Sequence, residues 1–295
     1  MEQTFTNGHP ITEPITVGLS QSDIEATINA YLEFSELPED IKAKAQYKPD
    51  PADDSRRNVG AGYRPSPKSA PNHLDTSKDK KEVFHYTPDI TRVIGVLAAH
   101  DRPLALQRFD AAAQAVWETA ATAARTKLQE LAAEYPLVEG IHFNPDGATN
   151  NHLRFLAYYG NGEQELAAGH YDKSTLTIAL AESHGGLRLA ERPQDLSLLE
   201  RDPTQPVIFH GRGWLKLMEQ LGSTSNRVPA WHDVVEVDGL GVKDDILRWA
   251  LIYFVNPARM DTAPSKIETE TPLSDAEIAK LKQNYRQVGS LAVAL

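Results

Sequence analysis

The chain has 295 residues, of which 41% are hydrophobic and 24% are charged, as is ordinary for a soluble globular protein with a sizeable core. A net charge of −11 argues against a nucleic-acid partner, because phosphate binding requires clustered Lys and Arg. The absence of cysteine excludes disulfides, thiolate catalysis, iron–sulfur clusters and cysteine-based zinc sites. The first residues lack the features of a signal peptide and no segment approaches about 18 consecutive apolar residues, so we expect a cytoplasmic protein with no membrane partner.

The first half of the chain predicts helices around one long loop. Residues 20–46 carry an apolar stripe interrupted by a proline and predict two helices. Residues 47–82 are rich in Pro, Asp, Ser and Lys and predict a lid-like loop, either a surface excursion or a flap over a pocket. Residues 104–135 have apolar residues at helical spacing and predict one long helix. We therefore expect an N-terminal helical region over residues 1–136.

The second half predicts strands. Gly185 and Gly186 indicate a hairpin connection between two of them. Many short strands without intervening helices predict a fold that is mainly β with flanking helices (α+β), with a jelly-roll core over residues 137–262 and a C-terminal helical extension over residues 263–295 that packs on this core. The β-prone runs are LRFLAYY, STLTIALA, GLRLAE, PVIFH, RVPAWHDVVEV and LRWALIYFV.

Three residues form a candidate metal site: His170, Asp172 and His232. Two imidazoles and one carboxylate can cover one face of an octahedral metal and leave the opposite face open. The His-x-Asp spacing alone is weak, since His73 and Asp75 repeat it inside the lid-like loop. His170 and Asp172 differ because they stand at the entry to a predicted strand, where side chains two residues apart share a face. A buried histidine bonded to a neighbouring carboxylate or to backbone is an open alternative for His232.

Arg248 is a cation inside an otherwise apolar predicted strand. A buried and unpaired charge is costly, so this arginine requires an anionic partner. The partner is either a carboxylate of the protein itself or a carboxylate of a bound ligand, which a guanidinium group can hold through two hydrogen bonds.

These motifs occur in the order found in a known family. From about residue 152 to residue 257 the chain resembles the iron- and 2-oxoglutarate-dependent dioxygenases, in particular their isopenicillin N synthase-like branch. The resemblance rests on LRFLAYYG, HYD, HGGLRL, WHDVV and RWALIYFVNP, and extends more loosely to ELPEDIKAKAQY, GAGYRPS and DKKEVFHYTP upstream.

The resemblance implies a double-stranded β-helix that binds Fe(II) through His170, Asp172 and His232. It assigns the distal carboxylate of the co-substrate 2-oxoglutarate to Arg248, with Tyr158 as a helper. It further implies an oxidoreductase that uses O2 to oxidise, most commonly to hydroxylate, a small-molecule substrate, with release of succinate and CO2. Neither the substrate nor the oligomeric state follows from the sequence.

The chain departs from the family pattern in three places. Ala250 stands where the family has Ser or Thr, which removes one hydroxyl donor, a loss of about 0.5–1.5 kcal/mol. Leu156 replaces an asparagine and weakens the assignment of Tyr158, and the amino terminus looks abbreviated. Three alternatives stay open: a 2-oxoglutarate-independent oxidase of the isopenicillin N synthase type, in which Arg248 holds the substrate's carboxylate, a non-catalytic jelly-roll binding protein, and a zinc hydrolase, for which His184 and His210 would be candidate bases.

Overall fold

A computed structural model describes most of the chain. The described residues are 11–49, 60–65, 81–143, 149–159, 165–225, 227–237, 242, 246–258 and 263–292.

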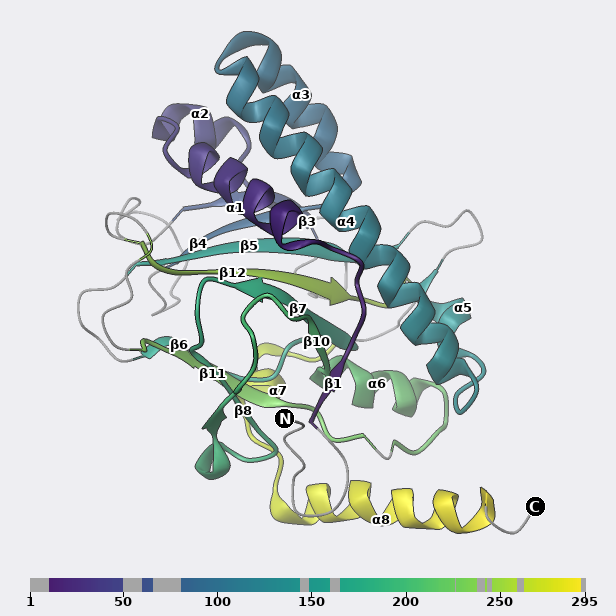
Figure 1. Ribbon diagram of the computed structural model, residues 1–295. Coiled ribbons are helices and arrows are strands. Elements are labelled where there is room, and N and C mark those ends of the chain that lie inside the picture. Colours follow the sequence, from purple (N-terminus) through teal and green to yellow (C-terminus); the bar gives the residue numbers. More distant parts are fainter. Residues whose placement is uncertain are drawn as a thin grey trace.

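Two antiparallel sheets form the centre of the molecule (Figure 1). The larger sheet has the strand order β1-β10-β7-β12-β5-β4-β3-β2, and the smaller sheet has the order β6-β11-β8-β9. The strands of the larger sheet are β1 (Thr12–Pro14), β2 (Lys48–Pro49), β3 (Gly60–Arg64), β4 (Lys81–Tyr86), β5 (His152–Tyr159), β7 (Leu176–Glu182), β10 (Val207–His210) and β12 (Ile246–Val255). Those of the smaller sheet are β6 (Glu165–His170), β8 (Leu187–Ala190), β9 (Ser197–Leu198) and β11 (Trp231–Val235).

The expected jelly-roll core is confirmed. From β5 onward the chain passes back and forth between the two sheets, and the strands β5 to β12 divide evenly between them. This is the winding of a double-stranded β-helix, in which the inner faces of two sheets enclose a space between them. Side chains that alternate along each strand therefore point in turn into this space and away from it.

The helices lie mainly before the β-helix core. The two helices predicted over residues 20–46 and the long helix predicted over residues 104–135 are confirmed, whereas the sequence analysis did not foresee α3, α5 and α6. The helices are α1 (Gln21–Ser35), α2 (Glu39–Lys44), α3 (Thr91–His100), α4 (Pro103–Ala132), α5 (Val138–His142), α6 (Arg212–Gln220), α7 (Lys266–Glu270) and α8 (Asp275–Ala292), with 3-10 turns η1 (Pro88–Ile90) and η2 (Pro193–Asp195).

The predicted hairpin at Gly185 and Gly186 is wrong, because β7 and β8 lie in different sheets. The connection instead crosses from the larger sheet to the smaller one. Gly186 has a φ of +147°, and a Cβ atom there would lie 2.6 Å from the carbonyl oxygen of Val235. Only glycine fits at position 186 in the connection between the two sheets. The pair Gly185 and Gly186 correctly indicated a sharp turn, but it did not reveal which strands the turn joins.

The lid-like loop predicted over residues 47–82 is wrong in part. Gly60–Arg64 forms β3, which pairs with β4 in the register Tyr63↔Phe84 and extends the larger sheet. Strand β4 begins at Lys81, inside the expected loop. Residues 50–59 and 66–80 lie outside the described residues, and with them the second His-x-Asp pair, His73 and Asp75.

Aromatic side chains join the helical layer to the larger sheet. In Figure 1, α1 and α4 lie across the face of this sheet that points away from the smaller sheet. Phe109 of α4 is fully buried, and its ring centroid lies 4.9 Å from those of Phe34 and Phe84 and 5.2 Å from that of Phe155. Phe34 comes from α1 and the other two from β4 and β5, so one ring ties three elements together.

The C-terminal helices contact the smaller sheet. Helix α8 begins with a capping box between Ser274 and Glu277, in which each backbone amide donates to the other's side chain. Leu273 and Ile278 pack in a small apolar cluster with Tyr171 and Trp231, and the Tyr171 hydroxyl accepts from the Leu273 amide at 3.1 Å. This cluster lies directly beside the strand ends that carry the candidate metal ligands.

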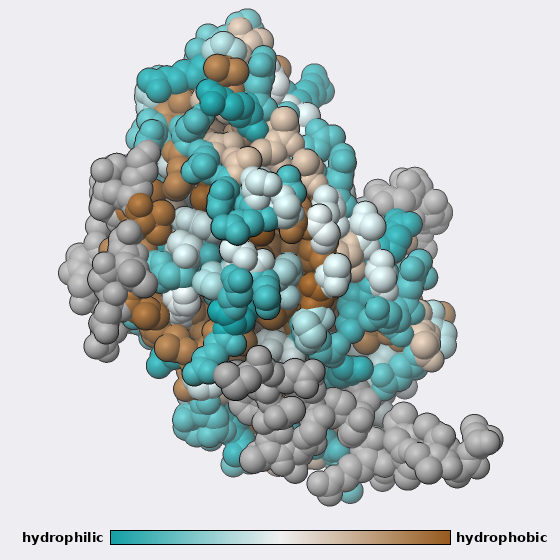
Figure 2. Space-filling model, viewed as in Figure 1, coloured by the Kyte–Doolittle hydropathy of each residue, from teal (hydrophilic) through white to brown (hydrophobic). Residues whose placement is uncertain are grey.

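The surface mixes hydrophilic and hydrophobic residues on the face shown in Figure 2. Val96 of α3, Leu104 of α4 and Leu137, which precedes α5, are large apolar side chains that are exposed, as is normal for a folded protein. Within the described residues, no helix combines the length and apolar character needed to cross a bilayer.

We predict that Phe109→Ala lowers the free energy of unfolding by about 3–5 kcal/mol, because it removes a fully buried ring that contacts three elements. Leu104→Ala on the same helix is the matched control, since that side chain is 62% exposed and should change stability by less than about 0.5 kcal/mol. Urea denaturation of both variants measures the difference. Equal stabilities would contradict the account of the core.

Candidate metal centre

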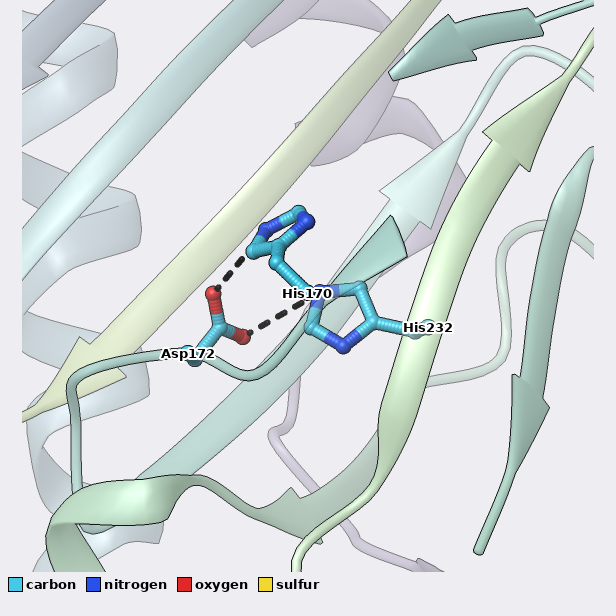
Figure 3. A group of neighbouring side chains, drawn as sticks. All are labelled: His170, Asp172 and His232. Carbon is cyan, nitrogen blue, oxygen red and sulfur yellow. Dashed lines mark ion pairs between the residues drawn. The ribbon is translucent and has the colours of Figure 1, made fainter. Parts of the chain in front are cut away.

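The structure brings His170, Asp172 and His232 together (Figure 3). His170 is the last residue of β6, Asp172 lies two residues later in the connection to β7, and His232 lies in β11 opposite His170 in the register of the two strands. One carboxylate oxygen of Asp172 lies 3.8 Å from Nε2 of His170, and the other lies 3.7 Å from Nε2 of His232. Candidate ligand atoms from all three residues lie within 4.8 Å of one another.

Hydrogen bonds orient the three side chains toward a common point. Nδ1 of His170 lies 2.7 Å from the carbonyl oxygen of Ala168, and Nδ1 of His232 lies 3.1 Å from that of Ala230. A carbonyl only accepts, so each Nδ1 carries the proton and each Nε2 presents its lone pair. The Thr177 hydroxyl donates to Asp172 at 2.7 Å and fixes the carboxylate. Such outer partners are typical of metal sites, where they set the orientation and basicity of the ligands.

The protonation states also suit a metal ion. Burial and the neighbouring His232 lower the pKa of His170, so this imidazole is neutral at neutral pH. Burial by itself raises the pKa of Asp172, but the two histidines and the Thr177 hydroxyl outweigh it and leave this pKa below its ordinary value. Two neutral imidazoles and one carboxylate are the donor set of facial-triad Fe(II) sites. The residues present therefore fit a divalent ion such as Fe(II).

A pocket between the two sheets opens onto this centre. It encloses about 580 Å³ of empty space, part of which is open to solvent. The side chain of His170 is 32% exposed, whereas those of Asp172 and His232 are 8% and 7% exposed, so His170 is the most open to solvent of the three residues. The lining residues are Lys81, Arg154, Leu156, Tyr158, Ala167, His170, Asp172, Ala179, Ala181, Glu182, Leu187, Arg201, Phe209, His232, Val234, Arg248, Ala250, Ile252 and Phe254.

Arg248 lines this pocket and is 2% exposed. The sequence left open whether Arg248 pairs with a carboxylate of the protein or with one of a bound ligand. In the structure its Nη2 donates to Oε2 of Glu182, a carboxylate of the protein. A second guanidinium group, that of Arg201, lies on the other oxygen of the same carboxylate at 3.3 Å. One carboxylate shared by two guanidinium groups leaves one positive charge uncompensated within this cluster.

Tyr158 lies in the same part of the pocket as Arg248. The two residues are paired across β5 and β12, and the guanidinium carbon of Arg248 lies 5.3 Å from the centre of the Tyr158 ring. Leu156 and Ala250 also line the pocket, so the two departures noted in the sequence place apolar groups on its wall. Ala250 therefore provides no hydroxyl group and Leu156 no amide group to this part of the wall, unlike the Ser or Thr and the Asn of the family pattern.

Arg154 is a pocket residue whose role the sequence analysis missed. Its guanidinium group lies 4.3 Å from the centre of the Phe254 ring, near Asp172. Burial lowers the pKa of Arg154 to about 10, although Asp172 opposes this shift. The sequence could have indicated this buried cation, because Arg154, like Arg248, interrupts an apolar β-prone run. Arg154 thus places a buried positive charge on the pocket wall near Asp172.

Some charged side chains and histidines near the two sheets lie outside the pocket lining. Arg188 of β8 donates two hydrogen bonds to Asp233 at 2.8 and 2.5 Å, so it is paired within the protein. His184 and His210, considered as bases for a zinc hydrolase, are not among the lining residues. The described pocket therefore places neither histidine where it could activate a metal-bound water.

Several solved structures share this fold. A full-length Neurospora crassa protein in complex with alpha-KG and thymine matches with a TM-score of 0.56 and 16% identity, over 92% of this chain and 86% of that one. The 2-oxoglutarate complex of AtDAO1, the dioxygenase for auxin oxidation 1 from Arabidopsis thaliana, matches with a TM-score of 0.54 and 18% identity, over 90% and 86%. The dioxygenase for auxin oxidation of rice matches with a TM-score of 0.55 and 17% identity, over 93% and 85%.

At these identities the likeness establishes the fold. No family model matches the chain, and no curated protein matches it either. The chain therefore shares the fold of these solved structures, including the double-stranded β-helix, over nearly its whole length.

We predict that His232→Ala weakens Mn(II) binding by at least about 100-fold, because loss of a ligand must exceed the 10–100-fold effect of losing an outer partner. The far-UV circular dichroism spectrum should be unchanged. His73→Ala is the matched control, since it alters the second His-x-Asp pair and should leave affinity intact. Equal Mn(II) affinity in the two variants, measured by calorimetry, would refute the site.

Metal affinity should also depend on pH in one direction. A lowered pKa means that proton competition at His170 begins below the ordinary imidazole value of about 6.5. Burial and His232 lower the pKa of His170 to about 4, so we expect proton competition at this ligand to weaken Mn(II) binding only below about pH 5, with a progressive loss as the pH falls through about 4. Free Mn(II) counted by electron paramagnetic resonance gives the profile, with His100→Gln as an exposed-histidine control. Undiminished affinity in acid would mean that imidazoles do not bind the ion.

Proposed function

We propose that the protein is a non-heme Fe(II)- and 2-oxoglutarate-dependent dioxygenase that oxidises a small-molecule substrate, most commonly by hydroxylation, with release of succinate and CO2. The observation that carries this proposal is the convergence of His170, Asp172 and His232 at the wall of a pocket. Three protein ligands on one side of an ion leave positions for a chelating co-substrate and for O2. The fold supports the proposal, because the Neurospora crassa protein and AtDAO1 share it and were solved with the co-substrate.

The chain's own residues would act by binding and positioning. His170, Asp172 and His232 would hold Fe(II), which supplies the redox chemistry when bound, and O2 is consumed with the co-substrate. Arg248 would hold the distal carboxylate of 2-oxoglutarate, and the Tyr158 hydroxyl would assist it. The apolar side chains of the pocket wall, such as Leu156 and Ala250, would exclude water from the bound co-substrate.

One observation favours a second candidate function. Because Arg248 already has a partner in Glu182, the protein could be a facial-triad oxidase that takes its electrons from the substrate and needs no 2-oxoglutarate. This is the reaction type of isopenicillin N synthase itself, which the sequence left open as an alternative. The pairing of one carboxylate, that of Glu182, with two guanidinium groups favours the dioxygenase. It leaves one positive charge that can pair with a carboxylate of the ligand.

Formation of succinate tests the choice. With Fe(II), O2 and 2-oxoglutarate, the protein should form succinate, slowly without substrate. Arg248→Ala should raise the 2-oxoglutarate concentration required for half-maximal rate by about 10–100-fold, because a charge-assisted hydrogen bond contributes about 1.5–3 kcal/mol. Glu182 keeps Arg201 as a partner in this variant, so the fold should survive.

Arg192→Ala is the matched control. Arg192 is paired with Asp275 at 3.0 Å outside the pocket lining, and its loss should leave the 2-oxoglutarate requirement unchanged. Absence of succinate from a metal-loaded protein would favour the oxidase. An unchanged requirement in Arg248→Ala would remove this arginine from the co-substrate site.

A further inference from the structure

Three charged side chains form a buried cluster at one end of the pocket, which we call the Arg–Glu–Arg cluster: Glu182, Arg201 and Arg248. Glu182 ends β7 and is 3% exposed, Arg248 lies in β12 and is 2% exposed, and the Arg201 side chain is 6% exposed. Each oxygen of Glu182 faces a different guanidinium group, Oε2 that of Arg248 and Oε1 that of Arg201. All three residues line the pocket that contains the metal ligands.

Several guanidinium N–H donors of the Arg–Glu–Arg cluster have no hydrogen-bond partner among the described residues. Nε and Nη1 of Arg248 and Nε of Arg201 are buried and have no hydrogen-bond acceptor in the described part of the chain. A buried donor without an acceptor costs about 1–3 kcal/mol, and more when it is charged. Donors of this kind at the wall of a pocket are therefore expected to meet an acceptor on a ligand.

The charges of the cluster do not balance. Two guanidinium groups and one carboxylate sum to one positive charge. Burial lowers the pKa of Arg201 and Arg248 lowers it further, whereas Glu182 opposes both. A guanidinium group nevertheless stays protonated in proteins, so the excess charge persists at neutral pH. One carboxylate of a ligand would neutralise it.

A purely structural role would require fewer arginines. Arg201 does have a local function, because its Nη1 donates to the carbonyl oxygen of Gln205 and thereby holds the turn before β10. That contact could be made by an exposed arginine without approaching Glu182. Burying a second guanidinium group beside the first adds like-charge repulsion and desolvation, which a structural ion pair of Glu182 and Arg248 alone would avoid.

We propose that Arg201 is a second co-substrate-binding residue, which together with Arg248 clamps the distal carboxylate of 2-oxoglutarate. Glu182 is the positioning residue that holds the two guanidinium groups at this distance. Arg201 thereby replaces the hydroxyl donor that Ala250 cannot provide. This inference rests on the proposed dioxygenase function and adds the residue that makes the clamp specific for a dicarboxylate.

The test compares two ligands that differ only at the far end. Calorimetry on Mn(II)-loaded protein gives the dissociation constants of 2-oxoglutarate and of 2-oxopentanoate, which has a methyl group in place of the distal carboxylate. We expect Arg201→Gln to weaken 2-oxoglutarate binding by about 10–100-fold and to leave 2-oxopentanoate binding within about twofold. Arg201→Lys should show a partial loss, because it keeps the charge but not the fork of donors.

Arg188→Gln is the matched control, since it breaks another arginine–carboxylate pair that lies outside the pocket lining. It should change neither constant. The melting temperature and Mn(II) affinity of each variant report whether the fold and the metal site survive. If Arg201→Gln lowers the melting temperature alone, or weakens both ligands equally, Arg201 is only structural and the proposal is overturned.

The outcome for the unaltered protein separates this proposal from the proposed function. If the Mn(II)-loaded protein binds 2-oxoglutarate but Arg201→Gln binds it equally well, only the role of Arg201 fails. If the unaltered protein does not prefer 2-oxoglutarate to 2-oxopentanoate, the dioxygenase proposal fails together with the clamp.

Discussion

The pairing of β6 with β11 is the constraint on which the candidate metal centre depends. In this pairing His232 lies opposite His170, so residues far apart in the chain present their imidazoles side by side. Asp172, two residues after the end of β6, then adds its carboxylate beside the two imidazoles. A shift of one residue in this register would turn His232 to the other face of the smaller sheet and separate the ligands.

The inner faces of the two sheets carry more charge than a core tolerates without function. Arg154, Arg201 and Arg248 all line the space between the sheets, where the carboxylates of Asp172 and Glu182 are the acidic partners. Buried cations in excess of buried anions destabilise an empty pocket, and the distal carboxylate of a bound dicarboxylate would lie against the excess positive charge of the Arg–Glu–Arg cluster. The pocket thus has the electrostatic character of a site that is completed by anionic ligands.

The sequence predicted the features that depend on local pattern. Helical periodicity located α1, α2 and α4, and the run of β-prone segments indicated the jelly roll. The candidate metal ligands could be recognised because His-x-Asp and the distal histidine occur at the positions of a known motif, and the structure brings these three residues together. Strand β6 was missed because ELAAG consists largely of small residues without β-branched or aromatic side chains.

The charged wall of the pocket was only partly predictable. Arg248 and Arg154 interrupt apolar strands and could be recognised as buried cations. Arg201 could not, since it lies in the polar segment between β9 and β10 and becomes buried only through tertiary contact with Glu182. Likewise β3 begins with a glycine-rich run and β4 with two charged residues, so local pattern does not reveal them, and each pairs with a neighbouring strand of the larger sheet.

X-ray diffraction at the manganese edge, from crystals grown anaerobically with Mn(II) and 2-oxoglutarate, tests the central claim most directly. The account predicts one anomalous peak within about 2.0–2.3 Å of Nε2 of His170, Nε2 of His232 and an oxygen of Asp172. A peak held by other residues, or none at this point in crystals that contain the metal, would contradict it.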